Sequence, residues 1–313
     1  MSSVFYVNGE FVTENEAHIP TDERGHQFGD GVYEVVRVYG GRPFLLPWHL
    51  ERLQRSCDGI GLTNPHTQGE WTQIIGEAVR RSGEAEATVY WQVTRGIAAR
   101  SHLFPQVQPS VTLSVRPVGS GPSQKSGKVL CYPDERWSNA WVKSINLLPN
   151  VMAKEVAHRV GASEALLVRE GDITEGCSSN AWFVKGHEVF TAPANRYILG
   201  GITRRFVLQL VKDLGYNVAE QTVTLDEIRD MDEAFVTSTT LEILGVEAVL
   251  VDAKREALLY DLPDVPSPSL MRMPEALETL WTSATHAVVP RLQAAFAQKV
   301  EQFRNYEEPV VSE

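Results

Sequence analysis

The chain has 313 residues, of which 43% are hydrophobic and 22% are charged. This composition is ordinary for a globular protein of about two domains, and it excludes a disordered or fibrous chain. The 40 acidic residues exceed the 29 basic ones and give a formal net charge of −11, which argues against nucleic acid as a partner.

The first part of the chain predicts a small α+β unit. Residues 31–39 are rich in β-branched and aromatic side chains, Gly40 and Gly41 suit a two-residue turn, and residues 42–46 return as a second strand. Sequential hairpins with separate helices favour an α+β fold over alternating βαβ units. The patterns that follow predict helices around 49–59 and 70–82 and strands at 87–95 and 110–117.

A run rich in Gly, Ser and Pro covers residues 118–127 and is typical of a linker. We therefore expect a small N-terminal domain at 1–118, an interdomain linker at 119–127 and a larger domain at 128–313. In the larger domain the patterns predict a strand at 128–132, a helix at 150–160, a meander of strands at 164–191, a helix at 201–214, strands at 233–239 and 247–252, a loop at 263–269, a helix that starts at Pro290 and a frayed end at 307–313.

The cysteines and the apolar stretches bear on location. Cys57, Cys131 and Cys177 are far apart and form no CxxC pair, which fits a reducing compartment. The N-terminus lacks the pattern of a signal peptide, and no stretch approaches the roughly 18 apolar residues of a membrane span. The sequence therefore predicts a cytoplasmic protein without a membrane partner.

Several common catalytic motifs are absent from the sequence. It has no GxxxxGK[ST], GxSxG or HExxH pattern, which argues against a nucleoside-triphosphate enzyme, a serine hydrolase and a zinc enzyme. The eight histidines are scattered without the spacing of metal ligands, so no metal site is expected. Only 8 of the 29 basic residues are lysines, so an amine nucleophile has few candidates.

Lys143 and Glu175 are the first candidates for chemistry. Lys143 lies in an apolar, β-like run, where burial would leave an amine able to attack a carbonyl group. The alternative is a lysine whose side chain reaches solvent from a strand edge. Glu175 lies beside Gly176 and small hydroxyl residues, and a carboxylate is what a pyridine nitrogen needs to stay protonated. The alternative is a glutamate in a turn between two strands.

Two further patterns suit an anion. Gly200 and Gly201 precede a predicted helix with Thr203 as a candidate N-cap, and the backbone N–H groups of such a helix start bind anions. Residues 237–240 end a predicted strand with four hydroxyl groups in a row. Ordinary capping and an ordinary threonine-rich strand end are the alternatives.

Two side chains in an extended loop suit a carboxylate ligand, and two others share one face of a strand. Tyr33 and Arg37 share one face of a strand, because alternate side chains point the same way. Arg100 and His102 lie two residues apart in an extended loop, unless both are simply solvated. An amine, a carboxylate, an anion-binding helix start and a hydroxyl cluster are together what a pyridoxal-phosphate site requires.

At these positions the sequence resembles the fold-type-IV pyridoxal-phosphate aminotransferases, and among them most closely the D-amino-acid aminotransferases. The resemblance implies an α+β fold of two domains, a small N-terminal α/β domain and a larger one with a β-barrel-like sheet, and pyridoxal 5′-phosphate as the cofactor. The matching blocks follow the family's order within residues 4–252. They are residues 22–36, 92–96, 143–148, 174–176, 201–204 and 235–240.

The resemblance also implies roles for single residues. Lys143 would form the internal aldimine and carry the proton, and Glu175 would pair with the pyridinium nitrogen. The other cofactor contacts match Arg52, Ile202, Thr203 and Thr239, with Thr240 and Ser178 as neighbours. The contacts to the substrate carboxylate match Tyr33, Arg100 and His102, with Arg37 near them on the same strand face.

The reaction implied by the resemblance is transamination of D-amino acids with 2-oxo acids, with D-alanine and 2-oxoglutarate as the type pair. In the family the loop that carries Arg100 and His102 reaches in from the partner subunit, so a homodimer is implied. A branched-chain L-aminotransferase, an (R)-amine transaminase, an aminodeoxychorismate lyase and a non-catalytic binding protein stay open as alternatives. After Asp252 the sequence departs from the family, and residues 254–286 follow no pattern that we can match.

Overall fold

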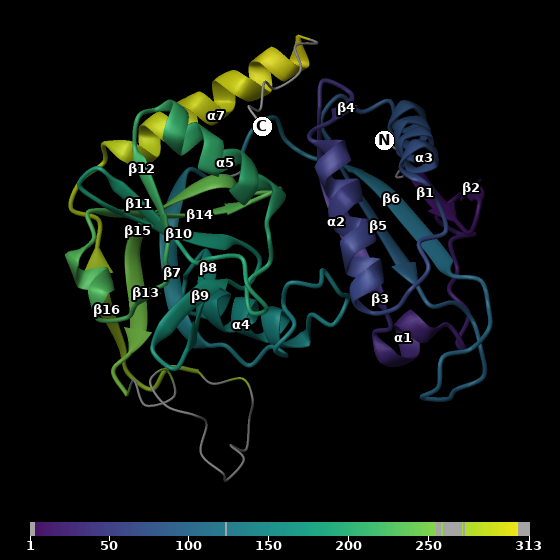
Figure 1. Cartoon of the computed structure of the whole chain (residues 1–313), viewed down its shortest axis with the longest axis horizontal. Helices are drawn as coiled ribbons and strands as arrows, with labels where there is room; N and C mark the ends of the chain where they lie inside the picture. The colour runs from purple at the N-terminus through teal and green to yellow at the C-terminus, as the bar shows by residue number, and fades with distance from the viewer. Residues whose placement is uncertain (1–3, 123, 255–257, 259–270, 272, 306–313) are drawn as a thin grey trace. The chain divides into compact units, whose positions relative to one another are not determined.

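The computed structural model describes residues 4–122, 124–254, 258, 271 and 273–305 (Figure 1). These residues form two compact units. Unit 1 contains the chain up to Gly121, the segment Trp141–Asn146 and the segment that begins at Val300. Unit 2 contains Pro122–Ala140 and Leu147–Lys299. The predicted boundaries at 118 and 128 stay a prediction, and Trp141–Asn146, which we expected in the larger domain, belongs to unit 1 by its contacts.

Unit 1 is built on a six-stranded antiparallel sheet of order β2-β1-β6-β5-β3-β4, counted over the described residues. Helices α2 and α3 pack against this sheet (Figure 1). The buried side chains of this core include Leu53, Trp71 and Trp91. The strands are β1 Val4–Val7, β2 Glu10–Val12, β3 Gly31–Tyr39, β4 Arg42–Pro43, β5 Ala87–Thr94 and β6 Ser110–Pro117, and the helices are α1 Arg24–Phe28, α2 Leu46–Gly59 and α3 Gln68–Ser82.

Local sequence signals account for the element boundaries in unit 1. Gly40 and Gly41 both have positive φ angles, 57° and 76°, which the predicted two-residue turn between β3 and β4 requires. Helix α3 begins with a capping box in which Thr67 accepts from the backbone of Glu70 and the Glu70 side chain accepts from the backbone of Thr67. These signals confirm the predicted hairpin and the second predicted helix.

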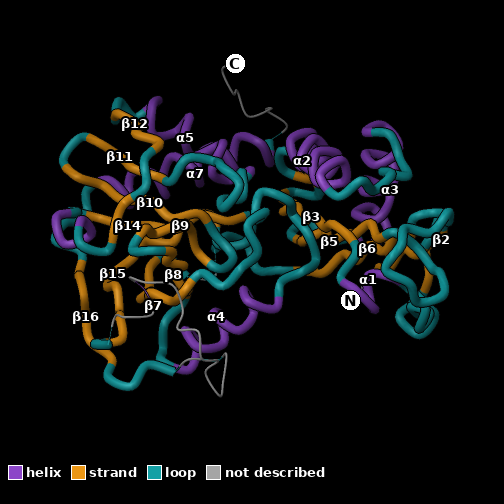
Figure 2. Tube along the Cα trace, turned by 60° about the horizontal axis from the view of Figure 1, so that its bottom comes forward, coloured by secondary structure: helices purple, strands orange, loops and turns teal. Residues whose placement is uncertain are grey.

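Unit 2 is built on a mixed sheet that has ten strands among the residues described (Figure 2). Its order is β12-β11-β10-β14-β15-β7-β8-β9-β13, with β16 paired to β15. The curled, half-barrel form of this sheet confirms the predicted fold class. The strands are β7 Ser126–Pro133, β8 Glu164–Arg169, β9 Asp172–Gly176, β10 Asn180–Lys185, β11 Glu188–Thr191, β12 Asn217–Glu220, β13 Val223–Thr224, β14 Glu233–Ser238, β15 Glu242–Asp252 and β16 Leu277–Thr282.

The sheet of unit 2 is buried on both faces. Along β7 and β8, Val129 and Leu166 belong to one apolar cluster, and their neighbours Leu130 and Leu167 belong to another that includes Val156 of α4. Adjacent residues of a strand point to opposite faces, so continuous apolar runs are needed here. The helical elements are α4 Leu148–Arg159, α5 Ile202–Asp213, the 3-10 turn η1 Glu227–Asp230 and α7 Val288–Arg304.

Several details differ from the expectations. The return strand predicted at 42–46 is only β4 Arg42–Pro43, because helix α2 begins at Leu46. Lys143 lies in an irregular segment that meets β3 at a single bridge, Val32 with Ser144, and not in a β-strand. Helix α7 begins at Val288, before the expected start at Pro290. Strand β16 falls in the region that matched no pattern. The predicted loop at 263–269 and the frayed end at 307–313 lie outside the described residues.

Candidate active site

Lys143 is fixed beside strand β3 by its backbone. Its N–H donates to the Ser56 hydroxyl at 3.1 Å, and its carbonyl accepts from the Tyr33 N–H at 3.0 Å. The half-buried side chain follows Tyr33, with Nζ 4.3 Å from the ring centre and 3.2 Å from the phenolic oxygen. The amine of Lys143 and the hydroxyl of Tyr33 therefore lie within hydrogen-bond distance, in a position that the two flanking backbone bonds hold.

Arg52 is held by a buried carboxylate that the sequence analysis missed. Glu34 of β3 is fully buried and accepts from Arg52 Nε at 2.7 Å and Nη2 at 2.8 Å. It also contacts His49 Nδ1 at 2.7 Å. His49 and Arg52 lie three residues apart on α2, which places them on one helix face. The spacing of His49 and Arg52, together with an acidic residue in an apolar strand, is the sequence pattern that could have predicted this buried cluster.

Burial and charge act in opposite directions on this cluster. Burial alone would raise the pKa of Glu34, but the charge and hydrogen bonds of Arg52 outweigh it and lower the pKa to about 2. Burial lowers the pKa of His49, against the opposing effect of Glu34. Glu34 is therefore a carboxylate and His49 is neutral near neutral pH.

Arg37 has partners of its own on β3. Its Nη2 donates to Glu86 at 3.0 Å and to the Gly119 carbonyl at 2.6 Å. Tyr33, the other predicted substrate contact on this strand, stacks on Tyr90 with ring centres 5.6 Å apart. Arg37 as a substrate ligand stays a prediction, and a substrate carboxylate would compete with Glu86 for its guanidinium.

Arg100 and His102 are brought together on one aromatic ring. Both side chains are exposed, in the loop between β5 and β6. The Arg100 guanidinium carbon lies 4.8 Å from the centre of the Phe28 ring, and the His102 ring centre lies 5.6 Å from it. The two predicted carboxylate ligands thus share one support in unit 1.

Glu175 of β9 is buried in unit 2 among hydrogen-bond donors. Arg136 Nη1 donates to its Oε1, Asn180 Nδ2 donates to Oε2 at 2.9 Å, and the Leu199 N–H lies 3.2 Å from both oxygens. Arg136 is itself held by Asp134, with Nε 2.9 Å from Oδ1. Sequence reasoning missed Arg136, because 39 residues separate it from Glu175, and it missed Asp134 together with Arg136. It also missed Asn180, although Asn180 lies only five residues after Glu175.

In unit 2, the negative charge of Glu175 is opposed by the positive charge of Arg136, which also pairs with Asp134. Burial raises the pKa of Glu175, and the charge and hydrogen bonds of Arg136 oppose that rise. Burial would lower the pKa of Arg136, but Glu175 and Asp134 outweigh it and raise the pKa. A carboxylate that accepts from a guanidinium, an amide and a backbone N–H is kept in one orientation, with its charge shared.

The start of helix α5 differs from the prediction in its cap. Gly201 is the N-cap and Thr203 lies in the first turn, so the proposed capping role of Thr203 was wrong. A side chain at Gly201 would meet the Asn180 Oδ1, since a Cβ there would lie only 2.1 Å from it. Asn180 also donates to the Leu199 carbonyl at 2.9 Å. The glycine therefore brings the helix start close to the residue that holds Glu175.

The remaining predicted cofactor contacts lie in turns of unit 2. Thr239 and Thr240 follow β14, and Thr239 is half-buried while Thr240 is exposed. Ser178 donates its hydroxyl to Glu164 at 2.6 Å. Glu164 is fully buried and also accepts from Ser179 at 3.2 Å. Ser178 is thus tied to the protein by a carboxylate that the sequence analysis did not single out.

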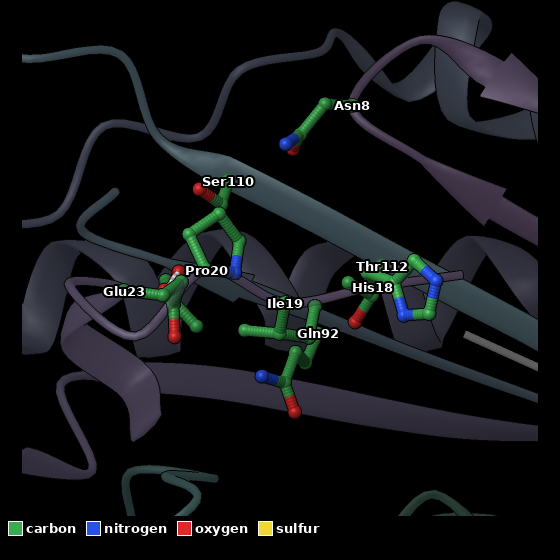
Figure 3. Close-up of a pocket in the computed structure, with 9 residues that line it drawn as sticks. Asn8, His18, Ile19, Pro20, Glu23, Gln92, Ser110 and Thr112 are labelled. Carbon is green, nitrogen blue, oxygen red and sulfur yellow. Dashed lines mark hydrogen bonds between the residues drawn. The ribbon is translucent and has the colours of Figure 1, made fainter. Parts of the chain in front are cut away.

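A small pocket elsewhere in unit 1 contains none of the predicted site residues. It opens between the segment 18–23 and strands β5 and β6 (Figure 3). His18, Glu23, Gln92 and Thr112 are among the side chains that line it (Figure 3). Its volume of about 10 Å³ is that of a water site. Among the residues that the structure describes, no group of three or more His, Cys, Asp or Glu could hold a metal ion.

Comparisons with known proteins identify the family. The model of the family described as Amino-transferase class IV matches residues 31–249, which is more than half of the chain. The chain belongs to the class IV aminotransferases. It is 39% identical to the D-alanine aminotransferase of Bacillus licheniformis over 245 residues, 77% of this chain and 87% of that protein. It is 38% identical to the D-alanine aminotransferase of Staphylococcus aureus (strain MSSA476) over 247 residues, with the same two coverages.

Solved structures show the same fold for this class IV aminotransferase. The branched-chain aminotransferase of Thermoproteus uzoniensis with norvaline superposes with a TM-score of 0.80 at 24% identity, over 95% of this chain and 94% of that one. The T.th. branched-chain amino acid aminotransferase complexed with N-(5'-phosphopyridoxyl)-L-glutamate gives a TM-score of 0.79 at 24% identity, over 98% and 97%. The resemblance to the family and the α+β fold expected from it are confirmed.

The class IV aminotransferases are pyridoxal 5′-phosphate enzymes, and as a member of this family the chain has the same cofactor. The residues present fit that group by their chemistry. Unit 1 holds an amine beside a phenol, and unit 2 holds a buried carboxylate and a helix start whose glycine N-cap has no room for a side chain. The substrates are an amino acid and a 2-oxo acid. No helix among the described residues is both long and apolar enough to cross a membrane.

Proposed function

We propose that this aminotransferase transfers the amino group of D-amino acids to 2-oxo acids, with D-alanine and 2-oxoglutarate as the type pair. The observation that carries the proposal is the 39% identity with a D-alanine aminotransferase over most of both chains. It is supported by Arg100 and His102, two exposed cationic or hydrogen-bonding side chains that share the Phe28 ring. Such a pair suits a carboxylate, which all amino acids carry.

Lys143 and Tyr33 are the residues to which we assign the proton transfer. When bound, pyridoxal 5′-phosphate supplies an aldehyde that takes the amino group and a ring that withdraws electrons from the α-carbon. The amine of Lys143, once neutral, takes a proton from that carbon and later returns one, as a general base and then a general acid. The Tyr33 hydroxyl, 3.2 Å from Nζ, holds the amine in place for both transfers.

Glu175 and the anion-binding groups would hold the cofactor. Glu175, oriented by Arg136 and Asn180, offers a negative charge that keeps a ring nitrogen protonated. We assign the phosphate to Arg52 and to the start of α5, because a helix start and a guanidinium both bind phosphate. The cofactor contacts proposed beside Arg52 are Ile202, Thr203, Thr239, Thr240 and Ser178.

Substrate binding is assigned to Tyr33, Arg100 and His102, with Arg37 as an additional candidate. A branched-chain L-aminotransferase remains the second candidate, since solved branched-chain enzymes share the fold. An identity of 24% to the branched-chain enzymes supports a shared fold only. The D-alanine aminotransferases are 38–39% identical to this chain. We also propose a homodimer and a cytoplasmic location, as the family resemblance and the cysteine usage suggested.

The test is a half-reaction of the cofactor-loaded enzyme with paired D- and L-amino acids. We expect D-alanine to convert the visible absorption of the bound aldehyde form to that of the amine form, and 2-oxoglutarate to restore it. L-Alanine and L-leucine should react at least about a hundredfold more slowly, a difference of about 2.7 kcal/mol in transition-state binding. A preference for L-leucine would overturn the stereochemical assignment in favour of the branched-chain activity.

The role of Lys143 is tested on the same preparation. Borohydride reduction followed by peptide mapping should place the pyridoxyl group on Lys143, and Lys143→Ala should lose the half-reaction while still binding the cofactor non-covalently. Lys154→Ala is the matched control, because Lys154 lies on α4 and contacts the Ser163 carbonyl. Label on another lysine would contradict the assignment.

A further inference from the structure

The short helix α1 and its flanking residues hold the loop that carries Arg100 and His102. We propose that Phe28 and Arg24 are positioning residues for the substrate carboxylate. Phe28 orders the two side chains, and Arg24 orders the backbone between them. The inference deepens the proposed function and rests on it, because it concerns how the same loop recognises a carboxylate.

The loop is closed at its base by backbone contacts with α1. The Arg24 N–H donates to the Gly96 carbonyl at 2.9 Å, the Ala98 N–H donates to the Asp22 carbonyl at 3.1 Å, and Glu23 and Ile97 form a β-bridge. Gly96 has a φ angle of 100°, and a Cβ there would lie 2.1 Å from the Gln108 carbonyl oxygen. The two ends of the loop therefore meet, and the helix start is part of that junction.

Arg24 connects its ion pair with the half-buried Asp30 to the backbone between Arg100 and His102. Its side chain is buried, and its Nε donates to Asp30 Oδ2 at 2.9 Å. Its Nη1 donates to the Ser101 carbonyl at 2.6 Å, and Ser101 lies between Arg100 and His102. Asp30 is fixed in turn by Arg95, whose Nε lies 2.9 Å from Oδ2 and 3.0 Å from Oδ1. A charge-assisted bond thus fixes the backbone at the centre of the pair.

Phe28 supplies the contact that the two exposed side chains share. The guanidinium carbons of Arg24 and Arg100 lie 4.7 Å and 4.8 Å from the centre of its ring, and the His102 ring packs against it at an interplanar angle of 51°. An exposed arginine otherwise samples many rotamers, and binding must pay for their loss. The contact of the Arg100 guanidinium with the Phe28 ring orders the arginine before the substrate binds, so less rotamer entropy is lost on binding. The energy of such a contact corresponds to about a fivefold change in affinity.

The kinetic test compares substrates with and without a carboxylate. In the holoenzyme, Phe28→Ala should raise KM for D-alanine about five- to tenfold and leave kcat within about twofold, because the contact acts on ground-state and transition-state binding alike. KM for (R)-1-phenylethylamine, which has no carboxylate, should stay near that of the wild type. Phe28→Trp should restore most of the affinity, since it keeps an aromatic face.

The matched control is Phe11→Ala. Phe11 is also partly buried and also carries an arginine, with the Arg81 guanidinium carbon 4.1 Å from its ring centre. We expect KM for D-alanine to be unchanged in this variant. In a double-mutant cycle, Phe28→Ala should add little to the KM defect of Arg100→Ala, because both changes remove the same ordered guanidinium.

A second readout does not depend on catalysis. Amide hydrogen exchange in residues 97–108 should speed up in Phe28→Ala and in Arg24→Lys, because lysine cannot span both Asp30 and the Ser101 carbonyl in the geometry of a guanidinium. Exchange in the same peptide should match the wild type in Phe11→Ala.

The outcomes separate this proposal from the proposed function. If the wild type converts only L-amino acids, the proposed function fails, and the KM ratio of L-alanine to (S)-1-phenylethylamine still decides the role of Phe28. Unchanged exchange in the loop together with unchanged KM would overturn the positioning role. An equal rise of KM for the amine and for alanine would overturn it as well, because it would indicate general damage to the site.

Discussion

Glu34 is a carboxylate with no exposed surface, and it is held between Arg52 and His49 in the core of unit 1. A buried charge pair of this kind does not guarantee stability, because desolvation offsets much of its attraction. Removal of one partner is different, since the other charge is then left in an apolar surrounding. The cluster therefore fixes the orientation of Arg52. Removing one of its charged members should destabilise the folded protein strongly.

We predict that Glu34→Gln lowers the free energy of unfolding by about 3–5 kcal/mol, because it leaves Arg52 buried without its counter-charge. The affinity of the apoenzyme for pyridoxal 5′-phosphate should also fall by roughly tenfold, which corresponds to about 1.4 kcal/mol, because an amide has one acceptor oxygen and Arg52 loses one of the two bonds that orient it. Urea-induced unfolding and titration of the quenching of tryptophan fluorescence measure the two effects.

The control is Glu77→Gln on α3. Glu77 also pairs with two arginines, Arg80 and Arg81, and hydrogen bonds from both lower its pKa to about 2. Its arginine partners are exposed, so we expect the unfolding midpoint and the cofactor affinity to stay at wild-type values. Equal destabilisation by Glu34→Gln and Glu77→Gln would show that burial is not the cause.

The contribution of Glu34 to the stability of the folded protein should decrease as the pH falls. Its pKa is about 2 in the folded protein against an ordinary value of 4.5, so its contribution to stability is complete above pH 4.5. The contribution is lost as the pH falls from 4.5 toward 2, where the folded protein takes up the proton. The difference between wild type and Glu34→Gln should therefore shrink over that interval.

At single residues, the sequence indicated candidate site residues but not the side chains that hold them. Lys143 and Glu175 stand in two of the motif blocks and Arg52 stands in the run 49–52, so each could be named as a candidate, and their roles stay a prediction. Glu34 and Arg136 could not be assigned in this way, since their partners Arg52 and Glu175 lie 18 and 39 residues away along the chain. Asp134 lies two residues from Arg136, but this pair gains meaning only once Arg136 is known to contact Glu175. Contacts between distant segments leave no local periodicity.

Helix α7 is attached to the sheet of unit 2 by a carboxylate on a neighbouring strand. Glu233 of β14 is buried, and its Oε1 accepts from the Ala287 and Val288 N–H groups at 2.8 Å each. Its Oε2 accepts from the Val289 N–H at 2.9 Å. These are donors that a helix start cannot satisfy within the helix, and a negative charge is favoured there.

We predict that Glu233→Gln destabilises the protein by about 2–3 kcal/mol, because an amide nitrogen cannot accept from these donors and leaves some of them unsatisfied. Amide hydrogen exchange in residues 287–291 should become faster in this variant, and it should rise more there than in the rest of α7. Glu227→Gln is the control, because Glu227 accepts from the N–H and hydroxyl of Thr224 in an exposed turn. Loss of stability only in the control would contradict the role of Glu233.

The same contact explains one error in the predicted elements. Proline is favoured in the first turn of a helix, so the sequence predicts Pro290 as the first residue of α7. The cap comes from Glu233 on another strand and lets the helix begin at Val288. The elements with local signals, such as the β3–β4 hairpin and helix α3, were predicted because the causes, the two turn glycines and the capping box, lie within a few residues.

At the scale of the whole chain, one segment belongs to a different unit by its contacts than its position in the sequence suggests. Trp141–Asn146 follows the first strand of unit 2 but belongs to unit 1. Val142 is buried in the core of unit 1, and the Trp141 ring lies against Gly59, where a Cβ would be 2.6 Å away. The composition predicts a linker at 119–127, but it could not show that the chain returns to unit 1 with Lys143.

Self-association is the prediction that concerns the whole molecule. Among the described residues of unit 1, the large apolar side chains that are exposed include Leu103, which is 80% exposed, and Val107, which is 41% exposed. Both lie in the loop with Arg100 and His102. Exposed apolar side chains on a loop whose base is fixed are typical of an interface with another chain. A homodimer would bury them.

We predict a native mass of twice the 34.9 kDa of the chain by sedimentation equilibrium at micromolar concentration. Leu103→Asp combined with Val107→Asp should shift the protein toward the monomer, because two carboxylates would be buried without partners at the interface. Leu277→Asp on β16 is the control, since Leu277 is also exposed and lies in unit 2. If the loop completes a site in the partner, the monomeric variant should lose affinity for D-alanine, and a monomeric wild type with normal KM would exclude that arrangement.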